Sequence, residues 1–273
     1  MKNFFKLTAF PKTDFGGNKA GVYINADNLS DLEMQEIAKE VNYSETAFVL
    51  KSDKADFKVR FFTPTSEVNL CGHATIATFN LLRDLDFIKP GIYKQETKAG
   101  ILSLDVREDF VFMEQVNPEF SEFVDIEEIR KCFKDVLFNE RLKPQVVSTG
   151  IREIFLPVKS LEVLNNLEPN FDEMIFLARK YNTIGIHAFA LNNDCDAYGR
   201  NFAPVVGVNE ESATGTSNGA LACYLYKHQI KKEKFVLRQG YSMTQPSEII
   251  VDLKFKNNEI DKVWVGGKAK IIW

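Results

Sequence analysis

Histidine and cysteine are scarce in this chain, which has three histidines and four cysteines among 273 residues. The histidines lie far apart and show no metal-ligand spacing, so we expect no metal. The cysteines form no CxxC motif and no disulfide-like spacing, which predicts a reducing, cytoplasmic setting. They are Cys71, Cys132, Cys195 and Cys223. Neither a P-loop nor a GxGxxG motif is present, so we also expect no nucleotide cofactor.

The sequence also lacks long apolar runs and blocks of one charge. No apolar run approaches the ~20 residues that a membrane helix needs. The apolar stretch within the first seven residues is too short and too soon interrupted to be a signal peptide. The 34 basic and 38 acidic residues give a net charge of −4 without a basic cluster. We therefore expect neither a membrane nor a nucleic acid as partner. With 45% hydrophobic residues, the chain can form one large domain or two smaller ones.

One stretch, from Phe61 to Thr78, organises the rest of the sequence. It predicts a strand, a turn and a helix that begins at Gly72. A helix start leaves backbone N–H groups unpaired and favours negative charge, and glycine lets a ligand approach the backbone. Cys71 and His73 flank this glycine. A thiol, an imidazole and an anion pocket are therefore expected side by side.

A similar pattern returns in the second half of the chain. Phe202-Ala203-Pro204 matches Phe62-Thr63-Pro64, and a polar turn ending at Thr214 leads into a second helix that begins at Gly215. Two such helix starts facing one cleft would bind an extended or doubly anionic carboxylate.

The order of the predicted elements is similar in the two halves: strands, a helix, more strands and a glycine-led central helix. A capping box of Ser30 and Glu33 predicts the first helix, and helices are also expected over residues 125–133 and 171–181. The pattern favours an α+β fold of two pseudo-symmetric domains, each a sheet wrapped around a central helix. We expect the first domain over residues 1–120, joined by a C-terminal strand at about 262–273, and the second over 121–261.

Short motifs are spread in order over most of the chain. They are Phe15–Val22, Ser44–Phe48, Phe62–Pro64 with Glu67, Cys71–Thr75, Thr149-Gly150, Arg200–Pro204, Ala213–Gly215, Gln239-Gly240 and Pro246-Ser247. With these motifs the chain resembles the phenazine-biosynthesis isomerase-like (PhzF-like) family. The resemblance implies the two-domain fold shared with diaminopimelate epimerase. It also implies a cofactor-free isomerase whose active site lies between the domains.

The resemblance also assigns roles to the residues that match its motifs. Glu45 is implied to be the acid/base, His73 to lie beside the substrate, and Glu211 to assist the reaction. The residues expected to bind the substrate are Asn18, Ser44, Cys71, Gly72, Gly215, Thr216 and Ser217. The chain departs from the usual family pattern at Lys19, at Glu210–Ser212 and at Gln245. These departures concern the substrate rather than the type of reaction.

Cys71 has two interpretations. A thiol at a helix start can have a depressed pKa and act as a base, and diaminopimelate epimerase uses two cysteines at its paired turns. The second turn of this chain carries Thr214 instead, and a hydroxyl cannot match a thiolate as a base near pH 7. We therefore favour a structural role for Cys71.

The sequence thus predicts an isomerase that moves a proton within a small carboxylate metabolite, with a homodimer as the expected assembly. Two alternatives stay open. An amino-acid racemase or epimerase of the same fold would exchange a Cα proton with change of configuration. A non-catalytic small-molecule-binding protein would bind its ligand without any proton exchange. Because the fold is compatible with many small acids, the substrate is left open.

Overall fold

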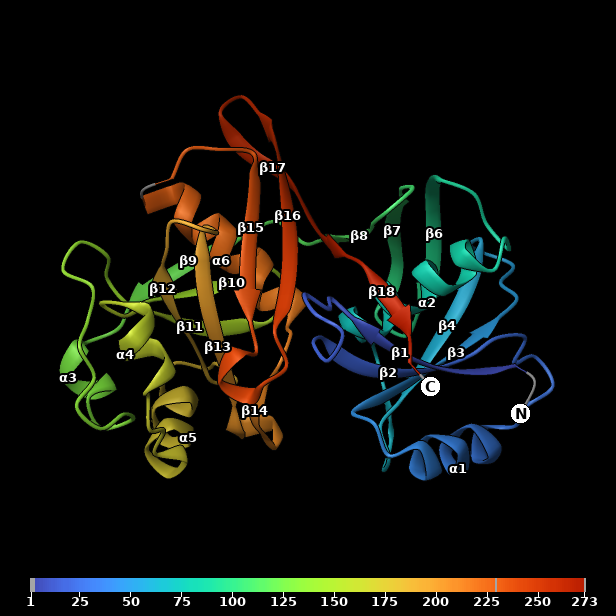
Figure 1. Ribbon diagram of the computed structural model, residues 1–273, viewed down its shortest axis with the longest axis horizontal. Coiled ribbons are helices and arrows are strands. Elements are labelled where there is room, and N and C mark those ends of the chain that lie inside the picture. Colours follow the sequence, from blue (N-terminus) through green and yellow to red (C-terminus); the bar gives the residue numbers. More distant parts are fainter. Residues whose placement is uncertain (1–2, 229, 273) are drawn as a thin grey trace. The chain divides into compact units, whose positions relative to one another are not determined.

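The computed structural model describes residues 3–228 and 230–272 (Figure 1). Its backbone contacts divide the chain into two compact units. Unit 1 consists of Met1–Glu114 and Gly266–Trp273, and unit 2 of Gln115–Val265. The domain boundaries expected from the sequence, at about residues 120 and 262, remain a prediction. The two compact units divide at residues 114/115 and 265/266.

Unit 1 is built on a mixed sheet. Its strands are β1 (Phe4–Ala9), β2 (Asn18–Tyr23), β3 (Glu45–Leu50), β4 (Phe57–Phe62), β5 (Glu67–Val68), β6 (Gly91–Thr97), β7 (Gly100–Val106), β8 (Val111–Gln115) and β18 (Ala269–Ile271). Successive pairs from β1–β2 to β6–β7 alternate between antiparallel and parallel, with β4 next to β6. β18 comes from the far end of the sequence and pairs with β1 (Figure 1).

The central helix of unit 1 is α2 (Gly72–Asp84), which confirms the helix predicted to begin at Gly72. Every residue from His73 to Leu82 is buried, and the helix contacts β1, β2, β3, β7 and β18. Its polar side chains pair with its own backbone: Thr75, Thr78 and Asn80 each donate to the carbonyl four residues earlier. A helix can be buried on every side when its side chains are small or apolar and its polar side chains hydrogen-bond to its own backbone.

Helix α1 (Asp31–Val41) packs against β3 and β4. Its predicted capping box is confirmed, because the Ser30 hydroxyl accepts from the Glu33 N–H and the Glu33 carboxylate accepts from the Ser30 N–H at 2.8 Å. The helix ends at Asn42, whose left-handed backbone turns the chain toward β3. This ending places Ser44 and Glu45 at the start of that strand.

The described residues of unit 2 form a second mixed sheet and four helices. Its strands are β9 (Glu119–Phe123), β10 (Gln145–Ser148), β11 (Arg152–Pro157), β12 (Ile186–Leu191), β13 (Ala197–Ala203), β14 (Val208–Glu211), β15 (Lys234–Gln239), β16 (Ser247–Lys256) and β17 (Glu259–Gly267). Its helices are α3 (Ile126–Ile129), α4 (Leu161–Asn165), α5 (Phe171–Lys180) and α6 (Gly215–His228), with 3₁₀ turns η1 (Pro204–Val206) and η2 (Tyr241–Met243). α6 is the central helix, and its residues Ser217–Leu225 are buried.

Strand pairing in unit 2 repeats that of unit 1. The pairs β10–β11, β11–β12, β12–β13, β13–β15 and β15–β16 alternate between antiparallel and parallel in the same order. Along the chain, a short antiparallel strand follows the fourth strand of each series and precedes the central helix. It is β5 after β4 in unit 1 and β14 after β13 in unit 2. The predicted α+β fold of two pseudo-symmetric domains is therefore confirmed.

One predicted helix is shorter than expected. Of residues 125–133, only Ile126–Ile129 are helical, after the Asp125 cap. Cys132 and Phe133 instead join the core of unit 2, and Phe133 forms a β-bridge with Pro169. Within residues 3–228 and 230–272, no helix is both long enough and apolar enough to cross a membrane.

Candidate active site

Six of the predicted site residues lie at one edge of unit 1, where two strands and α2 begin. β2 and β3 are parallel, with Ala20 opposite Glu45, so both strands begin at the same edge of the sheet. Asn18 opens β2, Glu45 opens β3, and α2 begins after Cys71. The six residues are Asn18, Ser44, Glu45, Cys71, Gly72 and His73.

The turn before β2 requires glycine at position 17. Gly17 has φ +89°, and a Cβ there would lie 2.3 Å from Thr8 Oγ1 and 2.5 Å from the carbonyl oxygen of Ala9. Any other residue would be strained and would push against β1. This turn fixes the position of Asn18, the next residue.

His73 is the centre of the cluster. Its Nδ1 lies 3.3 Å from Asn18 Nδ2 and 3.4 Å from Cys71 Sγ. Its Nε2 lies 3.4 Å from both Ser44 Oγ and Glu45 Oε2. A neutral imidazole donates from one nitrogen and accepts at the other, so His73 can link the amide of Asn18 to the carboxylate of Glu45.

Glu45 is partly shielded from water. Its side chain is 21% exposed, against 6% for His73. Oε2 is buried, and among the described residues it has no hydrogen-bond partner, although His73 Nε2 is within ion-pair distance. A carboxylate oxygen without a donor is an acceptor that a ligand proton can satisfy. Oε2 of Glu45 is an acceptor of this kind.

The start of α2 leaves room for a Cβ at Gly72. Cys71 precedes the helix in an extended conformation, and its side chain does not cap the first turn. A Cβ on Gly72 would meet only the terminal methyl of Met113, at 3.6 Å, among the described residues. The first N–H groups of the helix are thus the donors that an anion would take.

The other four predicted residues gather in unit 2 at the start of α6. Glu211 ends β14, and its Oε2 accepts from Thr214 Oγ1 at 3.2 Å. Gly215 is the buried first residue of the helix, and the carbonyl of Thr216 accepts from Thr149 Oγ1 at 3.1 Å. The fourth residue is Ser217. That the two helix starts face one cleft stays a prediction.

Sequence reasoning missed a buried polar cluster in unit 2. Glu153 on β11, His187 on β12 and Asn201 on β13 lie at or below 1% exposure. Asn201 Nδ2 lies 2.6 Å from Glu153 Oε1, 3.2 Å from His187 Nδ1 and 3.1 Å from Ser217 Oγ. The cluster therefore joins three strands to the first turn of α6. Its signal in the sequence was a glutamate directly before the apolar run Ile154–Val158.

Burial shifts the pKa values of the two titratable groups of this cluster in opposite directions. Burial raises the pKa of Glu153 to about 7, although hydrogen bonds with Ser217 and Asn201 oppose the rise. Burial also lowers the pKa of His187 to about 3. In both cases the low-dielectric interior disfavours the charged form. Both side chains are therefore held mainly in their neutral forms over a broad pH range.

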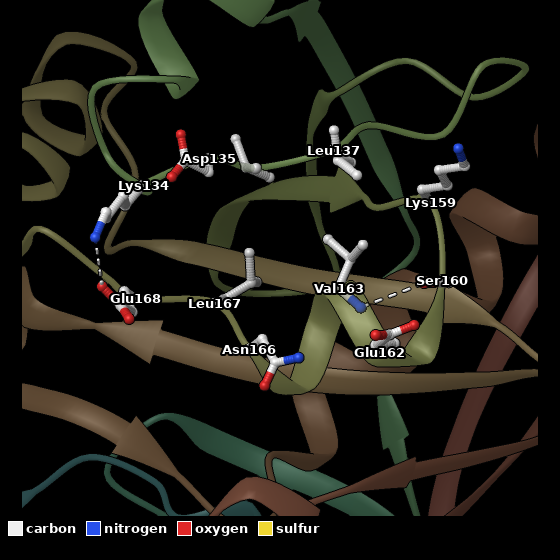
Figure 2. A pocket seen from close by; sticks show the side chains of 11 residues that line it. Lys134, Asp135, Leu137, Lys159, Ser160, Glu162, Val163, Asn166, Leu167 and Glu168 are labelled. Atoms are coloured by element: carbon white, nitrogen blue, oxygen red, sulfur yellow. Dashed lines mark hydrogen bonds and ion pairs between the residues drawn. The ribbon is translucent and has the colours of Figure 1, made fainter.

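A separate pocket of about 460 Å³ lies in unit 2 and holds none of the predicted site residues (Figure 2). Residues 134–137, the start of α4 and residues 166–168 line it. Lys134 and Glu168 form an ion pair of 3.9 Å across one end, with both side chains more than 70% exposed. Solvated charges of this kind do not build a specific site, and we assign this pocket no function.

Comparison with known proteins gives one family. The sequence matches the family model described as phenazine biosynthesis-like protein over residues 7–273. An uncharacterized isomerase of Clostridium acetobutylicum is 37% identical over 292 residues, which cover 99% of this chain and 96% of that protein. An uncharacterized isomerase of Bacillus subtilis is 34% identical, with 97% and 94% covered.

Solved structures agree with these sequence matches. The phenazine biosynthesis protein of the PhzF family from Bacillus anthracis matches with a TM-score of 0.90 and 29% identity, covering 99% of this chain and 97% of the other. A hydroxyproline epimerase from Agrobacterium vitis matches with a TM-score of 0.64 and 12% identity, covering 99% and 90%. At that identity the second match concerns the fold alone.

Proposed function

Since this chain belongs to the phenazine biosynthesis-like (PhzF-like) family and is an isomerase, we propose that it moves a proton within a small carboxylate metabolite without a cofactor. Glu45 is the acid/base of this reaction. One observation carries the proposal: the shielded Oε2 of Glu45 lies 3.4 Å from His73 Nε2 at the open start of α2.

The proposed reaction needs one group that both takes up and returns a proton. The Glu45 carboxylate removes a proton from one substrate carbon, the C–H electron pair forms a new double bond to the neighbouring carbon, and the pair of the old double bond shifts to the far carbon. The carboxylic acid then returns a proton to the carbon at the other end. The double bond has shifted and no electrons are gained or lost, so the reaction requires no oxidant or reductant.

His73 is proposed to orient Glu45 and to stabilise charge that develops on the substrate. Its position 3.4 Å from both Glu45 Oε2 and Ser44 Oγ supports this role. Glu211 is proposed to assist from unit 2, and its contact with Thr214 Oγ1 holds it at the start of α6. Preorganised hydrogen-bond donors are effective where water is largely excluded.

The internal repeat favours a single acid/base. Thr46 pairs with Phe62 in unit 1, and Ile186 pairs with Phe202 in unit 2, so the residue equivalent to Glu45 is Gly185. A Cβ at Gly185 would lie 1.8 Å from the carbonyl oxygen of Phe202, which leaves no room for a side chain. The repeat therefore supplies no second carboxylate at the position equivalent to Glu45, which fits a reaction with one acid/base.

A screen of carboxylate metabolites in deuterated water tests the proposal. We expect one substrate to take up deuterium at the carbon that receives the proton and to yield an isomer with a shifted double bond. Exchange at Cα with inversion would instead support the racemase or epimerase alternative. Binding of a ligand with no exchange would support a non-catalytic binding protein.

The start of α2 is proposed to bind the substrate carboxylate, and substitution of Gly72 tests this. Gly72→Leu should weaken carboxylate binding by about tenfold or more, which is about 1.4 kcal/mol, because its side chain occupies the space in front of the first N–H groups. Gly72→Ala is the matched control, since among residues 3–228 and 230–272 its Cβ meets only Met113, at 3.6 Å. Calorimetry with the substrate carboxylate measures both, and equal affinities would contradict the assignment.

A further inference from the structure

Three side chains of the proposed site also have the chemistry of a metal site. Glu45, Cys71 and His73 each offer one ligand atom, and these atoms all lie within 4.8 Å of one another. A thiolate, an imidazole and a carboxylate are the ligand types that zinc takes in proteins. The combination of sulfur and nitrogen disfavours magnesium and calcium, which prefer oxygen ligands.

The distances between these atoms suit tetrahedral zinc. Bond lengths of about 2.0–2.3 Å place neighbouring ligand atoms of such a site about 3.3–3.6 Å apart. His73 Nε2 lies 3.4 Å from Glu45 Oε2 and 3.9 Å from Cys71 Sγ. All three ligand atoms lie within 4.8 Å of one another, so the sulfur has to move closer for tetrahedral coordination.

Further features support the same ligand set. Glu45 Oε2 is buried and receives no hydrogen bond among the described residues, although His73 Nε2 lies 3.4 Å away. The Cys71 thiol stands at the N-terminus of α2, where the helix dipole stabilises a thiolate. Asn18 lies 3.3 Å from His73 Nδ1, and its side-chain amide holds the ring through that nitrogen. Such a partner orients a histidine that binds metal through Nε2.

We propose that Glu45, Cys71 and His73 bind one zinc ion, and that this ion inhibits the isomerase reversibly. The inhibition, but not the binding, rests on the proposed function of Glu45. A carboxylate oxygen that coordinates zinc has its lone pair on the metal and cannot take up a substrate proton. Zinc and substrate therefore compete for the same group.

Metal binding is measured first, without substrate, on the full chain after chelator treatment and removal of the chelator. We expect calorimetry to give one zinc ion per chain, with affinity at least about tenfold lower in Cys71→Ser and His73→Gln. Cys195→Ser is the matched control, because Cys195 is a half-buried free cysteine in unit 2. Cobalt should give a thiolate charge-transfer absorption that Cys71→Ser abolishes and Cys195→Ser retains.

Each outcome decides the proposal. Absence of zinc binding, equal affinity in the Cys71 and His73 variants, or magnesium binding as tight as zinc would overturn the site whatever the protein's activity. Circular dichroism identifies a variant that fails to fold, and the other ligand variant then decides. Turnover should fall at least about tenfold at saturating zinc and return with chelator. Unchanged turnover with zinc bound would overturn the inhibition, while loss of turnover in metal-free Glu45→Gln tests the proposed function separately.

Discussion

Glu45→Gln is expected to lower turnover by about 10²–10⁴-fold, the usual loss when a general acid/base is removed, with substrate affinity little changed. Glutamine keeps the size and the hydrogen-bonding capacity of glutamate but cannot take up and return a proton. The site of binding stays intact because the N–H groups of α2 and the His73 ring are not altered. Steady-state kinetics and calorimetry on the metal-free protein measure the two quantities.

Glu40→Gln is the matched control for this substitution. Glu40 is an exposed carboxylate on α1 of the same unit, so its loss should change neither turnover nor affinity. Near-normal turnover in Glu45→Gln would contradict the proposal. It would transfer the role to Cys71 or His73 and favour the epimerase alternative.

The second large expected effect is a pH-dependent contribution of Glu153 to the free energy of unfolding. Its pKa is raised from 4.5 to about 7 in the folded protein, so the folded state keeps a proton that the unfolded state releases. The stability from this group is fully present below pH 4.5 and is lost as the pH rises to about 7. At about 1.4 kcal/mol per pH unit, this loss is about 3 kcal/mol of the free energy of unfolding.

His187 acts in the opposite direction. Its pKa is lowered from 6.5 to about 3, so its contribution is present above pH 6.5 and is lost as the pH falls. Between pH 4.5 and 6.5 the two slopes cancel in the wild-type protein, which hides the effect of Glu153. The difference between wild type and a variant at position 153 is therefore the informative quantity.

Denaturant unfolding of wild type and Glu153→Gln at several pH values measures this difference. The wild-type stability minus the variant stability should fall by about 3 kcal/mol between pH 4.5 and 7, and then stay level. Glu162→Gln on α4, an exposed position in unit 2, should give a flat difference. A flat difference for Glu153→Gln as well would show that the buried carboxyl does not titrate as described.

Local signals predicted much of the fold. The capping box at Ser30 and the glycines at 72 and 215 mark helix starts that the structure confirms. These signals are reliable because each reports a backbone requirement that lies within a few residues. The motifs around Glu45 and Cys71–Thr75 likewise predicted the family, and the residues they contain meet at one edge of unit 1.

Long-range packing could not be predicted in the same way. Glu153, His187 and Asn201 are far apart in the sequence, and only the strand order of unit 2 brings them together. Phe133 was expected in a helix over residues 125–133, but it packs in the core of unit 2 and forms a bridge with Pro169. Strand β14 was missed because its residues Val208–Glu211 carry no apolar alternation and pair with β13 across a bulge.

The pairing of β18 with β1 has a consequence for how the chain is made. Leu7 lies opposite Ile271, and the Phe10 N–H donates to the carbonyl of Lys268. A ribosome therefore completes the whole of residues 115–265 before it supplies the strand that covers the outer edge of β1. During that interval the nascent first unit presents an unpaired strand edge, the kind of surface that invites pairing between chains.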